Sequence, residues 1–239
     1  FIFSKFSFFV DMFDISVIFQ NNFIKEITMV NKVAWITGAG SGIGEASAIK
    51  LASEGFSVVL SGRTRETLDM VASKCEGKVS VKPLDVSNYE DVKVVFEDII
   101  SDYGRIDVLV ASAGLNAKNR NWHNVSEKDF DQIIKIDLNG VFYTNRVVLE
   151  KMKEQREGLI INVSSWAGKY VTTLTGPAYT AAKHGVNALT EGINMEAGHF
   201  GVRACALCPG EVATPILDKR PIPVSKEDKE KMVQPEDCA

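Results

Sequence analysis

The sequence is poor in the residues that build metal centres and cross-linked frameworks. Its three histidines are scattered, at positions 123, 184 and 199, and its four cysteines form no paired framework for a chain of 239 residues. One Cys-x-x-Cys spacing occurs, at Cys205 and Cys208, in an apolar strand-like segment with no second pair beside it. We therefore expect buried free thiols, a reducing, cytoplasmic environment and no metal site.

An excess of positive charge and long apolar runs are also absent from the sequence. The formal net charge is -4, from 27 Lys and Arg against 31 Asp and Glu, so the chain lacks the basic surface that binds nucleic acid. No apolar run reaches the roughly 18 residues that a membrane span needs. The composition predicts a soluble protein that binds neither nucleic acid nor membranes.

The first 28 residues differ in composition from the rest and hold eight of the 13 phenylalanines. Charged residues interrupt this apolar stretch and it does not begin with Met, so the pattern is not that of a secretory signal. We expect residues 1–28 to be a non-native or disordered extension and residues 29–239 to form the domain. At the other end, VQPEDCA (233–239) has the proline and acids of a helix start, which predicts a truncated C-terminus.

Short apolar runs alternate with longer periodic segments from residue 33 onward. Strands are predicted at residues 33–36, 56–60, 78–84, 106–111, 159–164 and 202–207. These runs are nearly continuous in aliphatic residues, which is typical of parallel strands buried on both faces. Helix-length segments separate them, so the β-α repeat predicts one α/β domain with a doubly wound, Rossmann-type parallel sheet in three α/β/α layers.

The glycine-rich sequence TGAGSGIG (37–44) follows the first predicted strand. Glycines allow a sharp turn there and let backbone amides approach a pyrophosphate at the positive end of the next helix. The spacing differs from the usual Gly-x-Gly-x-x-Gly, and a glycine-rich turn without a nucleotide is the alternative. The position directly after the first strand favours a dinucleotide, and the residues predicted to bind it are Thr37, Gly38, Ser41, Gly42, Ile43 and Gly44.

The second predicted strand ends in VVLSGRT (58–64), without the acid that NAD-binding folds place there for the adenosine ribose. Arg63 follows instead, and a guanidinium can grip a 2′-phosphate through two parallel bonds. The sequence therefore favours NADP(H), with NAD(H) as the second candidate and a solvated surface arginine as the alternative interpretation. Asp85, after the third strand, either caps the next helix or contacts the adenine.

Two Tyr-x-x-x-Lys pairs occur, at Tyr179 and Lys183 and at Tyr89 and Lys93. Only the first has Ser165 14 residues before it, at the end of a strand whose carboxyl edge is where α/β folds bind ligands. An ammonium one helical turn away lowers a tyrosine pKa from its ordinary value near 10. We expect Ser165 to bond the substrate oxygen and Tyr179 to transfer a proton while a nicotinamide exchanges hydride.

Together these motifs resemble the classical short-chain dehydrogenase/reductase family. The resemblance runs from about Met29 to the end and also includes SAG (112–114) and CPGEVATP (208–215), in the family's order. It implies an oxidoreductase that interconverts a small-molecule alcohol and its carbonyl, and a homodimer or homotetramer when full length. The further cofactor contacts that it implies are Asp85 and Val86 at the adenine, Ala113 and Gly114 in the cleft, Tyr179 and Lys183 at the nicotinamide ribose, and Pro209, Gly210, Val212 and Thr214 at the nicotinamide.

The chain departs from the family's pattern in three places. Ala111 and Ser112 replace two asparagines that tie the central strands together, and the family's last helix and strand are missing. Asp137 stands in place of the catalytic asparagine, because Gly140 fixes the register of the Asn-x-x-Gly motif. The resemblance places Asp137 on the proton path from Lys183; the alternative is a bond to backbone within its own helix. These departures leave a non-catalytic dinucleotide-binding module as the alternative function.

Candidate substrate-pocket residues lie at positions 116–122, 166–170 and 216–224. They mix Trp, Arg, Asn and aliphatic side chains and indicate no single class of substrate.

Overall fold

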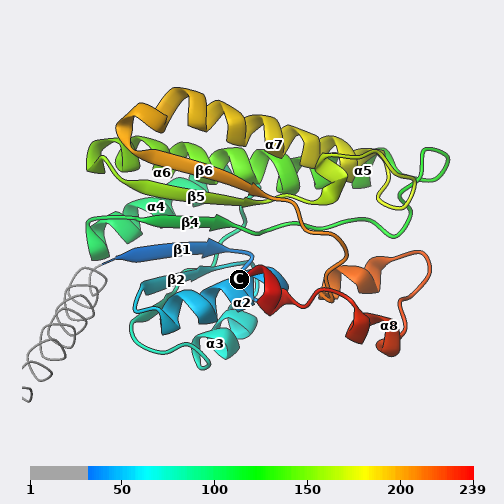
Figure 1. Ribbon diagram of the computed structural model, residues 1–239, viewed down its shortest axis with the longest axis horizontal. Coiled ribbons are helices and arrows are strands. Elements are labelled where there is room, and N and C mark those ends of the chain that lie inside the picture. The colour runs from blue at the N-terminus through cyan, green and yellow to red at the C-terminus, as the bar shows by residue number, and fades with distance from the viewer. Residues whose placement is uncertain (1–31) are drawn as a thin grey trace, which may run out of the picture.

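A six-stranded parallel sheet forms the centre of the protein (Figure 1). The computed structural model describes residues 32–239, so the predicted extension at residues 1–28 lies outside the described residues. The strand order is β3-β2-β1-β4-β5-β6, which confirms the predicted doubly wound α/β fold. The strands are β1 (Val33–Thr37), β2 (Ser57–Ser61), β3 (Val79–Val81), β4 (Val108–Ala111), β5 (Gly158–Val163) and β6 (Val202–Leu207).

Helices cover both faces of the sheet (Figure 1). On one face lie α2 (Gly42–Ser53) and α3 (Arg65–Ala72), and on the other lie α4 (Tyr89–Tyr103), α6 (Gly140–Gln155) and α7 (Pro177–Ala197). Successive strand residues point to opposite faces, so Trp35 joins the core under α4 and α6 while Ile36 joins the core under α2 and α3. The sheet thus separates two apolar cores.

The shorter elements lie mostly beyond the carboxyl ends of the strands, at the right of Figure 1. They are α5 (Glu127–Ile134), the π-helical turn η1 (Lys135–Asn139), the 3₁₀ turns η2 (Trp166–Gly168), η3 (Gly198–Phe200), η4 (Pro215–Lys219) and η5 (Pro235–Cys238), and α8 (Lys226–Lys231). The predicted helix start near the C-terminus corresponds to η5, where Gln234 and Asp237 form a capping box.

The prediction that all strands are buried on both faces is wrong at the edges of the sheet. Every residue of β1, β2 and β4 is buried, whereas β3 is half-buried and β6 exposes Arg203 and Cys205. An edge strand has a neighbour on one side only, so the described elements cover it less completely. The predicted burial of the thiols is therefore wrong: Cys205 is exposed and the other three cysteines are half-buried, although all four are free.

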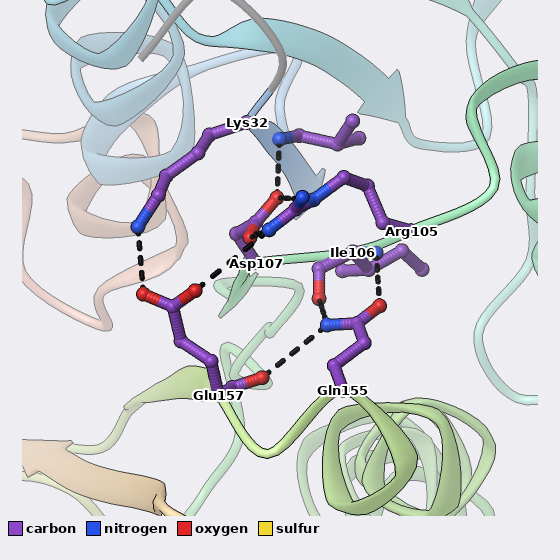
Figure 2. Close-up of polar contacts among 7 residues, drawn as sticks. Lys32, Arg105, Ile106, Asp107, Gln155 and Glu157 are labelled. Carbon is purple, nitrogen blue, oxygen red and sulfur yellow. Dashed lines mark hydrogen bonds and ion pairs between the residues drawn. The ribbon is translucent and has the colours of Figure 1, made fainter. Parts of the chain in front are cut away.

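A polar cluster joins the starts of β1 and β4 to the end of α6, at the edge opposite the carboxyl ends of the strands (Figure 2). The carboxylate of Asp107, just before β4, is buried and accepts a bond of 2.8 Å from the backbone N–H of Val33 in β1. The Arg105 guanidinium donates three further bonds to it, of 3.2 and 2.9 Å from Nε and of 2.5 Å from Nη2. Because one carboxylate binds both segments, β1 and β4 start at a fixed offset.

The same cluster reaches the end of α6. The Gln155 side chain bonds both the N–H and the C=O of Ile106, at 3.1 and 2.8 Å. Glu157 pairs with Lys32 at 2.7 Å and with Arg105 at 3.7 Å. We call this group the amino-edge cluster; it consists of Lys32, Arg105, Asp107, Gln155 and Glu157 (Figure 2).

Candidate active site

A cavity of about 350 Å³ opens where the ends of β1, β4 and β5 meet the segment that follows β6. The sheet brings to it residues from six separate stretches of the sequence, because parallel strands all end at one edge. Those of the predicted site residues that line the cavity are Gly38, Ser41, Gly42, Ile43, Gly114, Asp137, Ser165, Tyr179, Lys183, Pro209, Gly210, Val212 and Thr214.

The glycine-rich loop needs its glycines for close approach of the backbone. Gly38 has φ +65°, and a Cβ there would lie 2.7 Å from the Cα of Ala113. A Cβ on Gly44 would collide with the carbonyl oxygen of Gly38. Gly42, at φ +57°, begins α2 and lines the cavity beside the exposed Ser41. The loop is thus a tight backbone cradle at a helix N-terminus, which suits an anionic group.

Ser165, Tyr179 and Lys183 meet on one side of this cavity. Tyr179 lies in the first turn of α7, which Pro177 begins, and its ring centroid is 5.3 Å from Lys183 Nζ. Lys183 is 3% exposed and donates a bond of 2.9 Å to the carbonyl of Val163 at the end of β5. The serine hydroxyl accepts a bond from the N–H of Ala167.

Burial raises the pKa of Tyr179 above its ordinary value near 10. The Lys183 ammonium acts in the opposite direction, as predicted, and so does a hydrogen bond with Ser165. The carboxylate of Asp137 adds to the rise. Lys183 therefore lowers the pKa of Tyr179 as expected, but by less than burial raises it.

Asp137 lies in the π-helical turn η1 between α5 and α6 and is completely buried. Its Oδ1 accepts a bond of 2.9 Å from the N–H of Leu115, and its Oδ2 is 3.6 Å from Lys183 Nζ. The alternative that Asp137 bonds backbone within its own helix is wrong, because Leu115 lies in the loop after β4. Burial raises the pKa of Asp137 to about 6, although Lys183 and the Leu115 bond lower it.

Gly114 makes room for this pair, since a Cβ there would lie 3.1 Å from Asp137 Oδ2 and 3.6 Å from Lys183 Nζ. A larger residue would crowd the two charged groups. The wide turn of a π-helix and the missing side chain at Gly114 together place a carboxylate against the lysine, a combination that sequence spacing does not reveal.

Other predicted cofactor residues lie around the cavity rather than in its lining. Thr37 is buried at the end of β1, and Arg63 is exposed just after β2. Asp85 accepts a bond from the N–H of Ser87, while the N-cap of α4 is Asn88, so the capping role considered for Asp85 is wrong. Gly44 and Ala113 make the loop contacts described above. Val86 packs against Gly140, where an added Cβ would lie 2.7 Å from Val86 Cγ2.

Several predicted pocket residues line the same cavity: Asn116, Arg120, Trp166, Ile216, Leu217, Lys219 and Arg220. Trp122 and Tyr170 do not, and they are 85% and 66% exposed. Sequence reasoning missed Leu174 and Thr175, which also line it. Their position just before Gly176 and α7 was the available signal, because that segment must lead into the helix of Tyr179.

The family model described as short chain dehydrogenase matches residues 32–222. The chain belongs to the short-chain dehydrogenase family. This dehydrogenase is 37% identical over 193 residues to 3-oxoacyl-[acyl-carrier-protein] reductase FabG of Thermotoga maritima. The matched region covers 80% of this chain and 78% of the relative. An uncharacterized oxidoreductase of Staphylococcus aureus strain USA300 is 37% identical over 191 residues, covering 79% and 81%.

Two solved structures share the fold of this dehydrogenase. An alcohol dehydrogenase from the archaeon Thermococcus sibiricus, complexed with 5-hydroxy-NADP, is 32% identical with a TM-score of 0.77 and covers 87% of this chain and 86% of its own. A 3-ketoacyl-(acyl-carrier-protein) reductase from Brucella melitensis, complexed with NADH, is 31% identical with a TM-score of 0.78 and covers 86% of each.

Membership of this family makes the dehydrogenase an oxidoreductase that acts on a CH–OH group or the corresponding carbonyl. The assignment favours an enzyme over the non-catalytic module considered above. Across residues 32–239, no helix combines the length and the apolar character that crossing a membrane requires.

Proposed function

We propose that this short-chain dehydrogenase interconverts an alcohol and its carbonyl with NADP(H), using Ser165, Tyr179 and Lys183 as its catalytic set. The observation that carries the proposal is that these three side chains and the glycine cradle of α2 line one cavity. The two structural relatives, one complexed with 5-hydroxy-NADP and one with NADH, support a nicotinamide dinucleotide as the cofactor.

The residues present fit such a cofactor. A Cβ on Gly38 or Gly44 would collide with neighbouring backbone, so the glycines keep this turn tight at the N-terminus of α2. Backbone amides at a helix N-terminus are suited to bind a pyrophosphate. Pro209, Gly210, Val212 and Thr214 line the cavity from the segment after β6 and are proposed to hold the nicotinamide side. Asp85 and Val86 are proposed to border the adenine, and Ala113 and Gly114 to line the cleft between.

When bound, the nicotinamide accepts or supplies the hydride. The Ser165 hydroxyl holds the substrate oxygen, and the Tyr179 hydroxyl donates a proton to it during reduction or takes one during oxidation. Lys183, fixed by its bond to the Val163 carbonyl, favours the phenolate that oxidation needs. Asp137 opposes this effect when ionised, so the pair of Lys183 and Asp137 sets the pH at which the tyrosine works.

The preference for NADP(H) rests on the end of β2. Ser61 is completely buried and its hydroxyl accepts a bond of 2.9 Å from the Trp35 indole, so it is not free for a ribose. Gly62 follows without a side chain, and Arg63 is exposed next to it. A guanidinium in that position suits a 2′-phosphate, whereas a carboxylate would suit the ribose hydroxyls of NAD(H).

Changing Gly62 to Asp is expected to reverse the cofactor preference. A carboxylate there accepts bonds from ribose hydroxyls and repels a 2′-phosphate, so the ratio of the Kd values for NADH and NADPH should fall roughly 10- to 100-fold. A Cβ at Gly62 would lie 3.3 Å from Leu68 Cδ2, a contact that a small side-chain shift relieves. Fluorescence titration with both cofactors measures the effect.

Gly62→Ala is the matched control, because it adds the same Cβ without a charge, and it should keep the preference for NADPH. Equal Kd values for NADH and NADPH in the unmodified protein would contradict the role proposed for Arg63.

We also propose that this protein is a cytoplasmic homodimer or homotetramer. The helices α4 and α6 pack side by side, and they expose Val94 and Phe142, which are 58% and 42% accessible. Apolar side chains on neighbouring helices are typical of a surface that another subunit covers.

Light scattering coupled to gel filtration should give two or four times the mass of one chain. The double variant Val94→Lys with Phe142→Lys should have a lower mass. A monomeric mass for the unmodified protein would reject the proposal.

A further inference from the structure

A buried arginine lines the cavity without a carboxylate partner among residues 32–239. Arg120, in the loop between β4 and α5, is 6% exposed. Its bonds all go to backbone carbonyls: 2.8 Å to Ala117, 2.6 Å to Lys219 and a long contact of 3.5 Å to Leu174. A guanidinium has five N–H groups, so these three bonds leave two for a ligand.

The charged side chains that line the cavity are unequal in number. Four are basic and two are acidic: Arg120, Lys183, Lys219 and Arg220 against Asp137 and Glu211. Glu211 binds Arg220 at 2.5 Å, and Asp137 lies beside Lys183. Within the described part of the chain, each carboxylate thus has a cation beside it, and Lys219 also acts electrostatically on Asp137. Arg120 is the cation of this set that has no carboxylate partner.

The buried guanidinium of Arg120, without a carboxylate partner, is unfavourable for the protein when no ligand is bound. Burial, and then the like charge of Arg220, lower the pKa of Arg120. A buried charge without an opposite charge costs free energy that an incoming anion would recover. The arrangement therefore favours an anionic ligand over a neutral one of the same shape.

The loop around Arg120 is fixed against the start of α7. Gly176 has φ +76°, and a Cβ there would collide with the carbonyl oxygen of Arg120. Asn116 Nδ2 donates a bond of 3.1 Å to the carbonyl of Thr175. Because Tyr179 follows in the first turn of α7, these contacts hold the arginine at a set position relative to the tyrosine hydroxyl, and the two groups interact electrostatically.

We propose that Arg120, assisted by Lys219, binds an anionic group on the substrate, so that the enzyme prefers carbonyl compounds carrying a carboxylate or a phosphate to neutral ones. This inference rests on the proposed function of the same cavity. Arg120 acts as a specificity-determining residue: it binds the substrate beyond the reacting carbonyl and leaves the proton transfer to Tyr179.

The test compares matched pairs of probes that differ only in charge. One pair is 4-oxopentanoate and its methyl ester; the other is dihydroxyacetone phosphate and dihydroxyacetone. In the unmodified enzyme with NADPH, kcat/KM should be at least about 10-fold higher for the anion of one pair, mostly through KM, and the pair showing it identifies the group. A preference in neither pair would overturn the inference and leave the proposed function standing.

Arg120→Gln and Arg120→Lys separate charge from packing, since both lose the guanidinium and only lysine keeps the charge. Gln should abolish the anion preference through a higher KM for the anionic probe, with kcat/KM for the neutral probe and the Kd of NADPH unchanged; Lys should retain part of the preference. Arg203→Gln, on the exposed side of β6, is the control and should change nothing. Equal loss for both probes, or weaker NADPH binding in both Arg120 variants, would overturn the inference, because Arg120 would then serve the fold or the cofactor.

A binding measurement keeps the inference separate from the proposed function. If the enzyme turns over none of the four probes, titration calorimetry of 4-oxopentanoate and of dihydroxyacetone phosphate into the NADP⁺-loaded protein decides the matter. Binding that Arg120→Gln abolishes and Arg120→Lys retains would support the anion site independently of any turnover. Binding of neither anion would overturn the inference.

Discussion

Replacing Tyr179 by phenylalanine is expected to lower kcat for carbonyl reduction by about 10²- to 10⁴-fold, the usual contribution of a general acid. The substitution keeps the ring that lies beside Lys183 and removes only the hydroxyl. NADPH should therefore bind nearly as tightly as before, and the loss should appear in kcat and kcat/KM together. Steady-state rates from NADPH oxidation and a fluorescence titration of the cofactor measure both quantities.

The chain contains its own control for this experiment. Tyr89 and Lys93 have the same spacing, and Lys93 Nζ lies 5.9 Å from the Tyr89 ring, but they are outside the cavity lining. Tyr89→Phe should leave turnover unchanged. Turnover at the unmodified rate in Tyr179→Phe would reject the proton-transfer role and with it the proposed catalytic set.

Replacing Asp137 by asparagine is expected to let the enzyme oxidise alcohols at lower pH. Ionised Asp137 raises the pKa of Tyr179, so removing its charge should shift the basic limb of the oxidation profile to lower pH and increase turnover near neutrality. Asn keeps an oxygen for the Leu115 N–H, which preserves the backbone bond. Identical pH profiles for the two proteins, with equal cofactor affinity, would show that Asp137 does not influence the proton transfer by Tyr179.

The same variant should be more stable at high pH than the unmodified protein. The pKa of the Asp137 carboxyl is about 6 in the folded protein, against an ordinary value of 3.8. The folded state therefore favours the protonated carboxyl, and the resulting stability is fully present below pH 4 and is lost as the pH rises through 6. A difference of about two units corresponds to about 3 kcal/mol. Urea unfolding at pH 5 and pH 8 should show a larger gain for Asp137→Asn at pH 8; a gain independent of pH would contradict the raised pKa.

Local patterns were sufficient to predict most of the sheet and the glycine cradle. Residues 58–60 are all aliphatic because β2 is covered on both faces, and the pattern reflects that burial directly. Gly38 and Gly44 are informative because only glycine fits the backbone contacts that they make. In these cases the residue type follows from one local cause, which is burial for the aliphatic run and close backbone contact for the glycines. The sequence alone is therefore sufficient to predict these features.

The properties that were missed depend on the surroundings of a residue. Cys205 belongs to an apolar run yet is exposed, because β6 is an edge strand. The pKa of Tyr179 is raised because the fold removes water from it, an effect that the spacing to Lys183 does not contain. Arg120 was one arginine in a loop, and its burial without a carboxylate became visible only once the loop packed against the start of α7.

The amino-edge cluster also bears on how the protein folds. The bond from Val33 to Asp107 joins residues 74 apart in the sequence, and the pair of Lys32 and Glu157 joins residues 125 apart. Each contact forms only after a long loop has closed, and closure costs chain entropy before any contact compensates for it. We therefore expect the central strands that carry the glycine cradle to pair after the helices have begun to form, so that the cavity assembles late in folding.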